Sequence, residues 1–267
     1  MKRSVGLLFV FLACGLASAQ TSDCGALTHQ ALELSGFNQS IDHMADVISS
    51  DQFMQQIRGR ASAEEFIAIF QPILEKEFNA ALLHRELESR MTAQCNPEQM
   101  TQALQRMQTP FVSRMLALES EVNTPEGQKK LKRYINIVQT VPPTDDRIDA
   151  LDALDASIGA SDFATDSTIA VMRGMMNGLG APPEVVAQVQ AHRKDIKTQI
   201  QNNVELSMAV MYHGVTRPEL QQYAKELSSE PLKGFNGQVK KVFLELMEER
   251  SQAIGQDLRK AMTAKKS

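Results

Sequence analysis

Asn96-Pro97-Glu98-Gln99-Met100 and Thr216-Arg217-Pro218-Glu219-Leu220 are the two stretches that decide the fold. In each stretch, a residue that can cap a helix precedes a proline and a glutamate, and apolar residues at helical spacing follow. A second proline comes thirteen positions after the first in both places, at Pro110 and Pro231. The repeated helix start predicts an all-α protein with an internal duplication.

The duplication divides the chain into two similar helical bundles, over residues 20–140 and 144–267. The Val141-Pro142-Pro143 stretch disfavours helix and marks the boundary between them. Pairing Leu220 with Met100 needs a slip of one residue relative to the prolines, so the duplication is old and divergent. No runs of alternating β-branched residues between glycine turns compete with the helical pattern.

Apolar residues spaced three and four apart place helices along both halves. One long helix is expected from Phe66 to Met91, bent at Pro72, and another from Val185 to Met211. A helix ending in Leu179 should stop at Gly180. The remaining helices are expected at 26–35, 41–48, from Pro97, at 110–122, 125–139 and 145–158, from Thr216, and after Pro231.

Residues 1–19 have the pattern of a secretory signal peptide. Lys2 and Arg3 precede an apolar run from Val5 to Ala13, and Ala17-Ser18-Ala19 is a small-residue cleavage site. The run is too short to cross about 30 Å of hydrocarbon as a helix. The sequence therefore predicts a periplasmic or secreted protein, soluble and without a transmembrane segment after cleavage. The alternative is a lipoprotein acylated at Cys14, although Leu12 fits that pattern poorly.

Removal of the signal peptide leaves two cysteines, Cys24 and Cys95. An exported protein folds under oxidising conditions, so a disulfide between them is predicted, with two unconnected buried thiols as the alternative. The bridge would hold the mature N-terminus beside the helix that starts at Pro97.

The mature chain is mildly acidic. Loss of Lys2 and Arg3 leaves 26 of the 28 Lys and Arg against 32 Asp and Glu, a formal charge of −6. A protein that binds nucleic acid normally presents a basic surface to the phosphates, so no nucleic-acid partner is expected. Trp is absent, which argues against an aromatic platform for sugars.

Three groups of residues could carry chemistry, and each has a structural interpretation that we favour. His84 and Glu88 are one turn apart, as a metal-binding pair would be, but they have no third ligand in the sequence. The aspartates at 145, 146, 149, 152 and 155 fit a solvated helix flank better than a calcium site. Met172, Met175 and Met176 fit core packing better than copper binding.

Gly174 and Gly178 lie four residues apart in the methionine-rich segment, which would allow another helix to approach closely. No motif for a nucleophile elbow, a zinc protease or a phosphate loop is present. No catalytic residue, cofactor or metal is therefore predicted.

Several segments resemble an uncharacterised family of exported bacterial helical domains. They are Leu32-Glu33-Leu34-Ser35-Gly36-Phe37, the helix start Pro218-Glu219-Leu220, and the steps Ser229-Glu230-Pro231-Leu232-Lys233-Gly234 and Thr124-Pro125-Glu126-Gly127, which are similar to a Ser-Pro-x-Gly step typical of that family. The resemblance implies a periplasmic helical protein of a Gram-negative bacterium, with no established activity or catalytic residues.

These patterns favour a non-enzymatic binding or adaptor module with a groove between its two halves. A peptide, a lipid or an envelope protein would be the partner. The alternatives are a structural envelope component that self-associates, and a metal-dependent hydrolase that uses His84, Glu88 and acids brought near them by folding.

Overall fold

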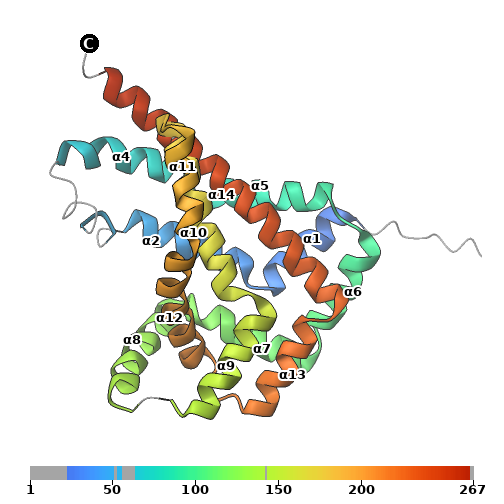
Figure 1. Ribbon diagram of the computed structural model, residues 1–267. Coiled ribbons are helices and arrows are strands. Elements are labelled where there is room, and N and C mark those ends of the chain that lie inside the picture. The colour runs from blue at the N-terminus through green and yellow to red at the C-terminus, as the bar shows by residue number, and fades with distance from the viewer. Residues whose placement is uncertain (1–22, 51–52, 56–63, 142, 265–267) are drawn as a thin grey trace, which may run out of the picture.

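The computed structural model describes residues 23–50, 53–55, 64–141 and 143–264. The expected signal peptide, Cys14 and Pro142 lie outside these residues. The described part forms thirteen α-helices and no strand, so the predicted all-α fold is confirmed (Figure 1). The helices are α1 (Cys24–Leu34), α2 (Phe37–Ser49), α4 (Glu64–Glu77), α5 (Ala80–Ala93), α6 (Pro97–Met107), α7 (Pro110–Val122), α8 (Pro125–Thr140), α9 (Asp145–Ile158), α10 (Ala160–Leu179), α11 (Pro183–Ala191), α12 (Arg193–Met211), α13 (Arg217–Leu227) and α14 (Glu230–Ala264).

The two helix starts quoted first from the sequence have the expected capping geometry. The Asn96 side chain accepts hydrogen bonds from the backbone N–H groups of Glu98 and Gln99, at 3.1 and 3.2 Å. At the second start, the Glu219 carboxylate accepts from the backbone N–H and the hydroxyl of Thr216, both at 2.8 Å. Both caps satisfy backbone groups that have no partner within the helix, which fixes where α6 and α13 begin.

Two of the expected long helices are wrong, because each is broken once. The first is divided into α4 and α5 at Phe78 and Asn79, where the Asn79 side chain accepts from the backbone N–H of Leu82 at 3.1 Å and caps α5. The second is divided into α11 and α12 at His192. At the first break, apolar spacing continues because α4 and α5 pack on the same core, so periodicity alone could not detect it.

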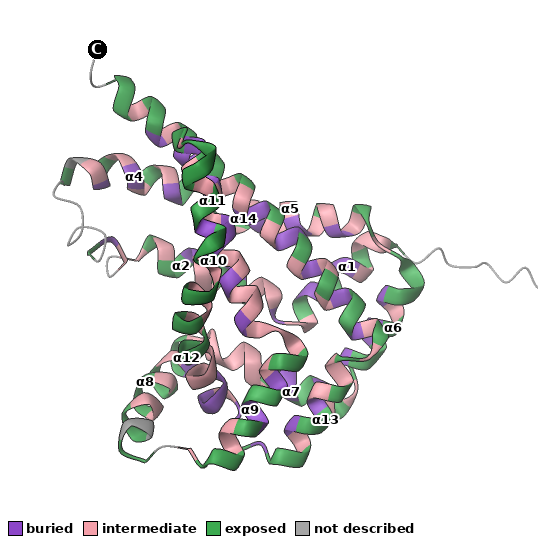
Figure 2. Ribbon diagram, in the orientation of Figure 1, coloured by how far each residue is buried: buried purple, intermediate pink, exposed green. Residues whose placement is uncertain are grey.

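The last helix, α14, is the central element of the fold. It packs against α10 more extensively than any other two helices pack, and it also contacts α4, α5 and α6 from the first predicted half (Figure 1). Buried residues of both halves, such as Leu87 and Leu246, belong to one hydrophobic cluster, and purple segments run through helices of both halves in Figure 2. The two predicted halves therefore share a single core, and the duplication itself stays a prediction.

Glycines allow α10 and α14 to pack at very short distance, as the spacing of Gly174 and Gly178 predicted. A Cβ atom added to Gly178 would lie 2.1 Å from the carbonyl oxygen of Gln252 on α14. One added to Gly255 of α14 would lie 2.4 Å from the carbonyl oxygen of Met175 on α10. Any side chain at these positions would push the two helices apart.

Candidate functional site

A cavity of about 600 Å³ lies between the helices of the two predicted halves. Its walls come from the α1–α2 junction, α6, α7, the α9–α10 junction, α12, α13 and the first part of α14. Most lining side chains are apolar, and the charged residues among them are Glu119 and Lys240. A mostly apolar cavity of this size with few polar groups is the usual form of a small-molecule site.

Glu119 lies on α7 and meets two tyrosines from the second half. Its Oε1 atom accepts hydrogen bonds from the hydroxyl groups of Tyr212 at 2.6 Å and Tyr223 at 2.7 Å. Both tyrosines are buried, with 1% and 0% of their surface exposed. The other carboxyl oxygen of Glu119 has no hydrogen-bond partner among the described residues, and Glu119 belongs to the cavity lining.

Burial controls the protonation of this group. It raises the pKa of Glu119, because a charged carboxylate loses its hydration there, and the hydrogen bonds from Tyr212 and Tyr223 oppose the rise. Burial together with the charge of Glu119 also raises the pKa of both tyrosines well above 10. The tyrosines therefore stay protonated and donate to Glu119, while the free carboxyl oxygen can accept a hydrogen bond or, when protonated, donate one.

Lys240, on α14, is the second charged group of the cavity. Its ammonium donates to the carbonyl oxygen of Ile158, the last residue of α9, where the helix dipole favours a positive charge. Its Nζ atom also lies 5.6 Å from the centre of the Phe163 ring. Burial lowers the pKa of Lys240, and the nearby carboxylates of Asp155 and Asp162 oppose this change.

Aromatic rings form part of the wall near Lys240. Phe37 of α2 and Phe163 of α10 both line the cavity, with ring centres 6.4 Å apart. Phe243 of α14 packs behind them, 5.3 Å from Phe37 and 5.7 Å from Phe163. These rings join the two halves and give the cavity a firm apolar wall.

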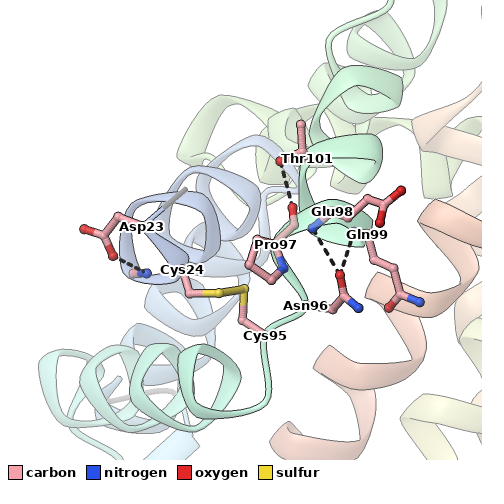
Figure 3. Close-up of a disulfide and its surroundings, with 9 residues drawn as sticks. Asp23, Cys24, Cys95, Asn96, Pro97, Glu98, Gln99 and Thr101 are labelled. Carbon is pink, nitrogen blue, oxygen red and sulfur yellow. Dashed lines mark hydrogen bonds between the residues drawn. A yellow bond between two sulfur atoms is a disulfide. The ribbon is translucent and has the colours of Figure 1, made fainter. Parts of the chain in front are cut away.

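The predicted disulfide is present. Cys24, the first residue of α1, is bonded to Cys95, which precedes the cap of α6, with Cα atoms 6.0 Å apart (Figure 3). Figure 3 also shows Asn96 capping the same end of α6, so the bridge and the cap hold this helix start together. The bridge is away from the cavity lining and has a structural role.

His84 and Glu88 line one surface pocket on α5, but their side chains contact different residues. The His84 ring contacts Asn38 at 3.0 Å and Asp42 at 2.7 Å, whereas Glu88 contacts His29 at 3.3 Å. Within the described ranges, no group of three or more His, Cys, Asp or Glu residues is arranged to hold a metal ion. None of the helices in the same ranges has the length and apolar character needed to cross a membrane.

Sequence reasoning missed the site residues Glu119, Tyr212, Tyr223 and Lys240. One signal for Glu119 was available, because it lies four residues after the buried Met115 and therefore on the apolar face of α7. Its tyrosine partners are 93 and 104 residues away in the chain, so no local pattern could identify them.

No family model, curated protein or solved structure matches the chain. The resemblance to exported helical domains therefore stays a prediction.

Proposed function

We propose that this protein is an exported, non-enzymatic binding protein that holds a lipid or a comparable apolar molecule in the cavity between its helices. The observation that carries the proposal is the cavity of about 600 Å³, with mostly apolar walls, between helices of both predicted halves. Water in such a space gains few hydrogen bonds, so an apolar ligand that displaces it is stabilised by burial of its surface.

The polar groups indicate how the ligand is oriented. The free oxygen of Glu119 offers a fixed hydrogen-bonding point in a wall that is otherwise mostly apolar, because the two tyrosines hold its other oxygen. A ligand with a single hydroxyl or similar group could pair with it, while its apolar body lies against rings such as Phe37 and Phe163. Export is supported by the Cys24–Cys95 disulfide, because such bonds persist mainly outside the reducing cytosol.

The hydrolase alternative required His84 and Glu88 to act together with a third ligand. The two side chains contact different residues, and the described ranges contain no group of three potential metal ligands. A structural component that self-associates needs an exposed interface between copies of the chain. The cavity does not supply such an interface, so it does not support this alternative.

The proposal is tested by filling part of the cavity with a larger side chain. Ala164 of α10 lines it, so Ala164→Phe would occupy part of the space, whereas Ala156→Phe places the same ring on an exposed position of α9 outside the lining. Binding of the dye 1-anilinonaphthalene-8-sulfonate is measured by fluorescence, and organic extracts of the freshly purified protein are analysed by mass spectrometry.

We expect dye binding and a co-purified lipid with the wild-type protein and with Ala156→Phe. Ala164→Phe should weaken dye binding by about tenfold or more, because the ring occupies space that the dye needs; a tenfold loss corresponds to about 1.4 kcal/mol. The proposal fails if folded wild-type protein binds neither dye nor lipid, or if both variants bind equally well.

A further inference from the structure

The helix α8 is a cationic segment of an acidic protein. It contains Lys129, Lys130, Lys132 and Arg133 and a single acidic residue, Glu126, which gives it a formal charge of +3. The whole chain has a formal charge of −4. The helix α8 is therefore a locally positive segment, and it lies at the edge of the molecule in Figure 1.

Three of these cations are available to an external partner. Lys129, Lys132 and Arg133 are exposed, and none of them takes part in an ion pair within the described part of the chain. Only Lys130 of the four has an acidic partner there, Glu121 of α7. Unpaired cations on a helix attract an anionic surface. The attraction acts over several ångströms at low and moderate ionic strength, and salt screens it.

The C-terminal end of α8 exposes apolar side chains. Ile137 is 55% exposed and Val141 is 69% exposed, which makes them the most exposed large hydrophobic residues of the described chain. Lys129, Arg133 and Ile137 follow one another at intervals of four residues, so they form one row along α8, and Val141 is the residue that ends the helix. The cations lie at the start of this row, and the exposed apolar residues lie at its C-terminal end.

A groove of about 300 Å³ runs beside this row, between α7, α8 and α12. Arg133 and Ile137 line it from α8, and Val122 lines it from α7. Met211 lines both this groove and the central cavity, so the groove lies against the cavity wall.

We propose that α8 docks the protein on a bilayer that contains anionic phospholipid. Lys129, Lys132 and Arg133 would contact the phosphates, and Ile137 and Val141 would enter the layer just beneath them. Nucleic acid offers the same phosphates, but it would leave the two apolar side chains in water. This docking surface lies outside the cavity, so it can be tested whether or not the cavity binds a ligand.

Docking is measured by sedimentation with vesicles of phosphatidylglycerol and phosphatidylcholine, and with vesicles of phosphatidylcholine alone, at low and high salt. The test variant combines Lys129→Gln, Lys132→Gln and Arg133→Gln. The control combines Lys194→Gln, Lys225→Gln and Lys241→Gln, which changes the net charge equally at exposed positions of α12, α13 and α14.

We expect the wild-type protein to bind the anionic vesicles, with weaker binding at high salt and little to phosphatidylcholine alone. Each cation near such a surface contributes about fivefold, so the test variant should lose on the order of 100-fold. The control should bind within about twofold of the wild-type protein, because screening limits the effect of distant charges. Equal losses in the two variants, or a wild-type protein that does not sediment with anionic vesicles, would overturn the proposal.

Insertion of α8 into the bilayer is measured separately by the fluorescence of one introduced tryptophan. The chain contains no Trp, so the introduced residue is the only one that emits as tryptophan. Ile137→Trp should show an emission shift to shorter wavelength with anionic vesicles. Met262→Trp, at a 47% exposed position near the distant end of α14, should not (Figure 1). If a short DNA duplex binds more tightly than the vesicles, and the emission of Ile137→Trp does not shift with lipid, α8 is a nucleic-acid surface and the proposal is wrong.

Discussion

Two glycines of the same helix, Gly237 and Gly255 of α14, should respond in opposite directions to the same substitution. Apart from the backbone of its own helix and its two chain neighbours, Gly237 has no atom within 4 Å of the position that a Cβ atom would occupy. A Cβ atom on Gly255 would lie 2.4 Å from the carbonyl oxygen of Met175, and 2.9 Å from the Cα atom of Gly178 and from the backbone nitrogen of Leu179. All three atoms belong to the backbone of α10, which cannot rotate away as a side chain would.

The expected free energies follow from these distances. Alanine is favoured over glycine inside a helix by up to about 1 kcal/mol, so Gly237→Ala should stabilise the protein by roughly 0.5–1 kcal/mol. Gly255→Ala has the same local gain, but α10 must move about 1 Å away from α14 to relieve the contact with Met175. Overpacking of this kind typically costs about 1–3 kcal/mol, and here it affects the most extensive helix pair of the fold. Because the local gain is the same in both variants, they should differ by the cost of overpacking, about 1–3 kcal/mol.

The assay is urea unfolding, followed by far-ultraviolet circular dichroism at constant pH with the disulfide intact. The slope of free energy against denaturant should be the same in both variants, so a shift in midpoint reports stability directly. If Gly255→Ala proves as stable as Gly237→Ala, the close contact between α10 and α14 does not exist in solution, and the reasoning is refuted.

Reduction of the Cys24–Cys95 bridge, which joins residues 71 apart, should lower the free energy of unfolding by about 4 kcal/mol in the chain-entropy model. Urea unfolding with and without dithiothreitol measures the loss, and alkylation of two thiols in the unreduced protein would contradict the bond. Glu119→Gln should keep hydrogen bonds from Tyr212 and Tyr223 but remove a proton-binding group whose pKa burial raises in the folded protein. The folded protein therefore binds this proton more tightly than the unfolded chain does. The resulting contribution of Glu119 to the free energy of unfolding is fully present below the unfolded pKa of about 4.3, and it is lost as pH rises through the folded pKa. Relative to Glu119→Gln, the wild-type protein should therefore lose stability with rising pH across that interval, by at most about 1.4 kcal/mol per pH unit, and a stability difference that does not change with pH would contradict the raised pKa.

Ion pairs show how the tertiary structure adds partners that the sequence does not indicate. Glu77 is a buried acidic residue that contacts Arg250 at 3.2 Å and the neighbouring Lys76 at 2.9 Å. Arg250 also pairs with Glu86 of α5. The pairing of Glu77 with Arg250 joins residues 173 positions apart and connects α14 to α4. In the sequence, Glu77 has the appearance of an ordinary charged residue near the end of a helix.

The sequence determined those features whose energetic cause lies within a few residues. Asn96 and the Thr216–Glu219 pair satisfy backbone groups of the helix that follows them, so their spacing alone located the starts of α6 and α13. The spacing of Gly174 and Gly178 likewise identified a face that another helix could approach closely. The cysteine count predicted the disulfide because only two cysteines remain after the expected signal peptide.

The tertiary structure alone decided where helices on the same core are interrupted, which helix lies at the centre, and where the cavity is. The break at Asn79 preserves the apolar spacing, so only the packed structure distinguishes two helices there from one. Glu119 meets Tyr212 and Tyr223 because α7 packs near the end of α12 and beside α13, and that arrangement depends on the burial of many side chains at once. Hydrophobic burial is not directional, so a pattern in the sequence shows which face of a helix is buried but does not show which distant helix will cover it.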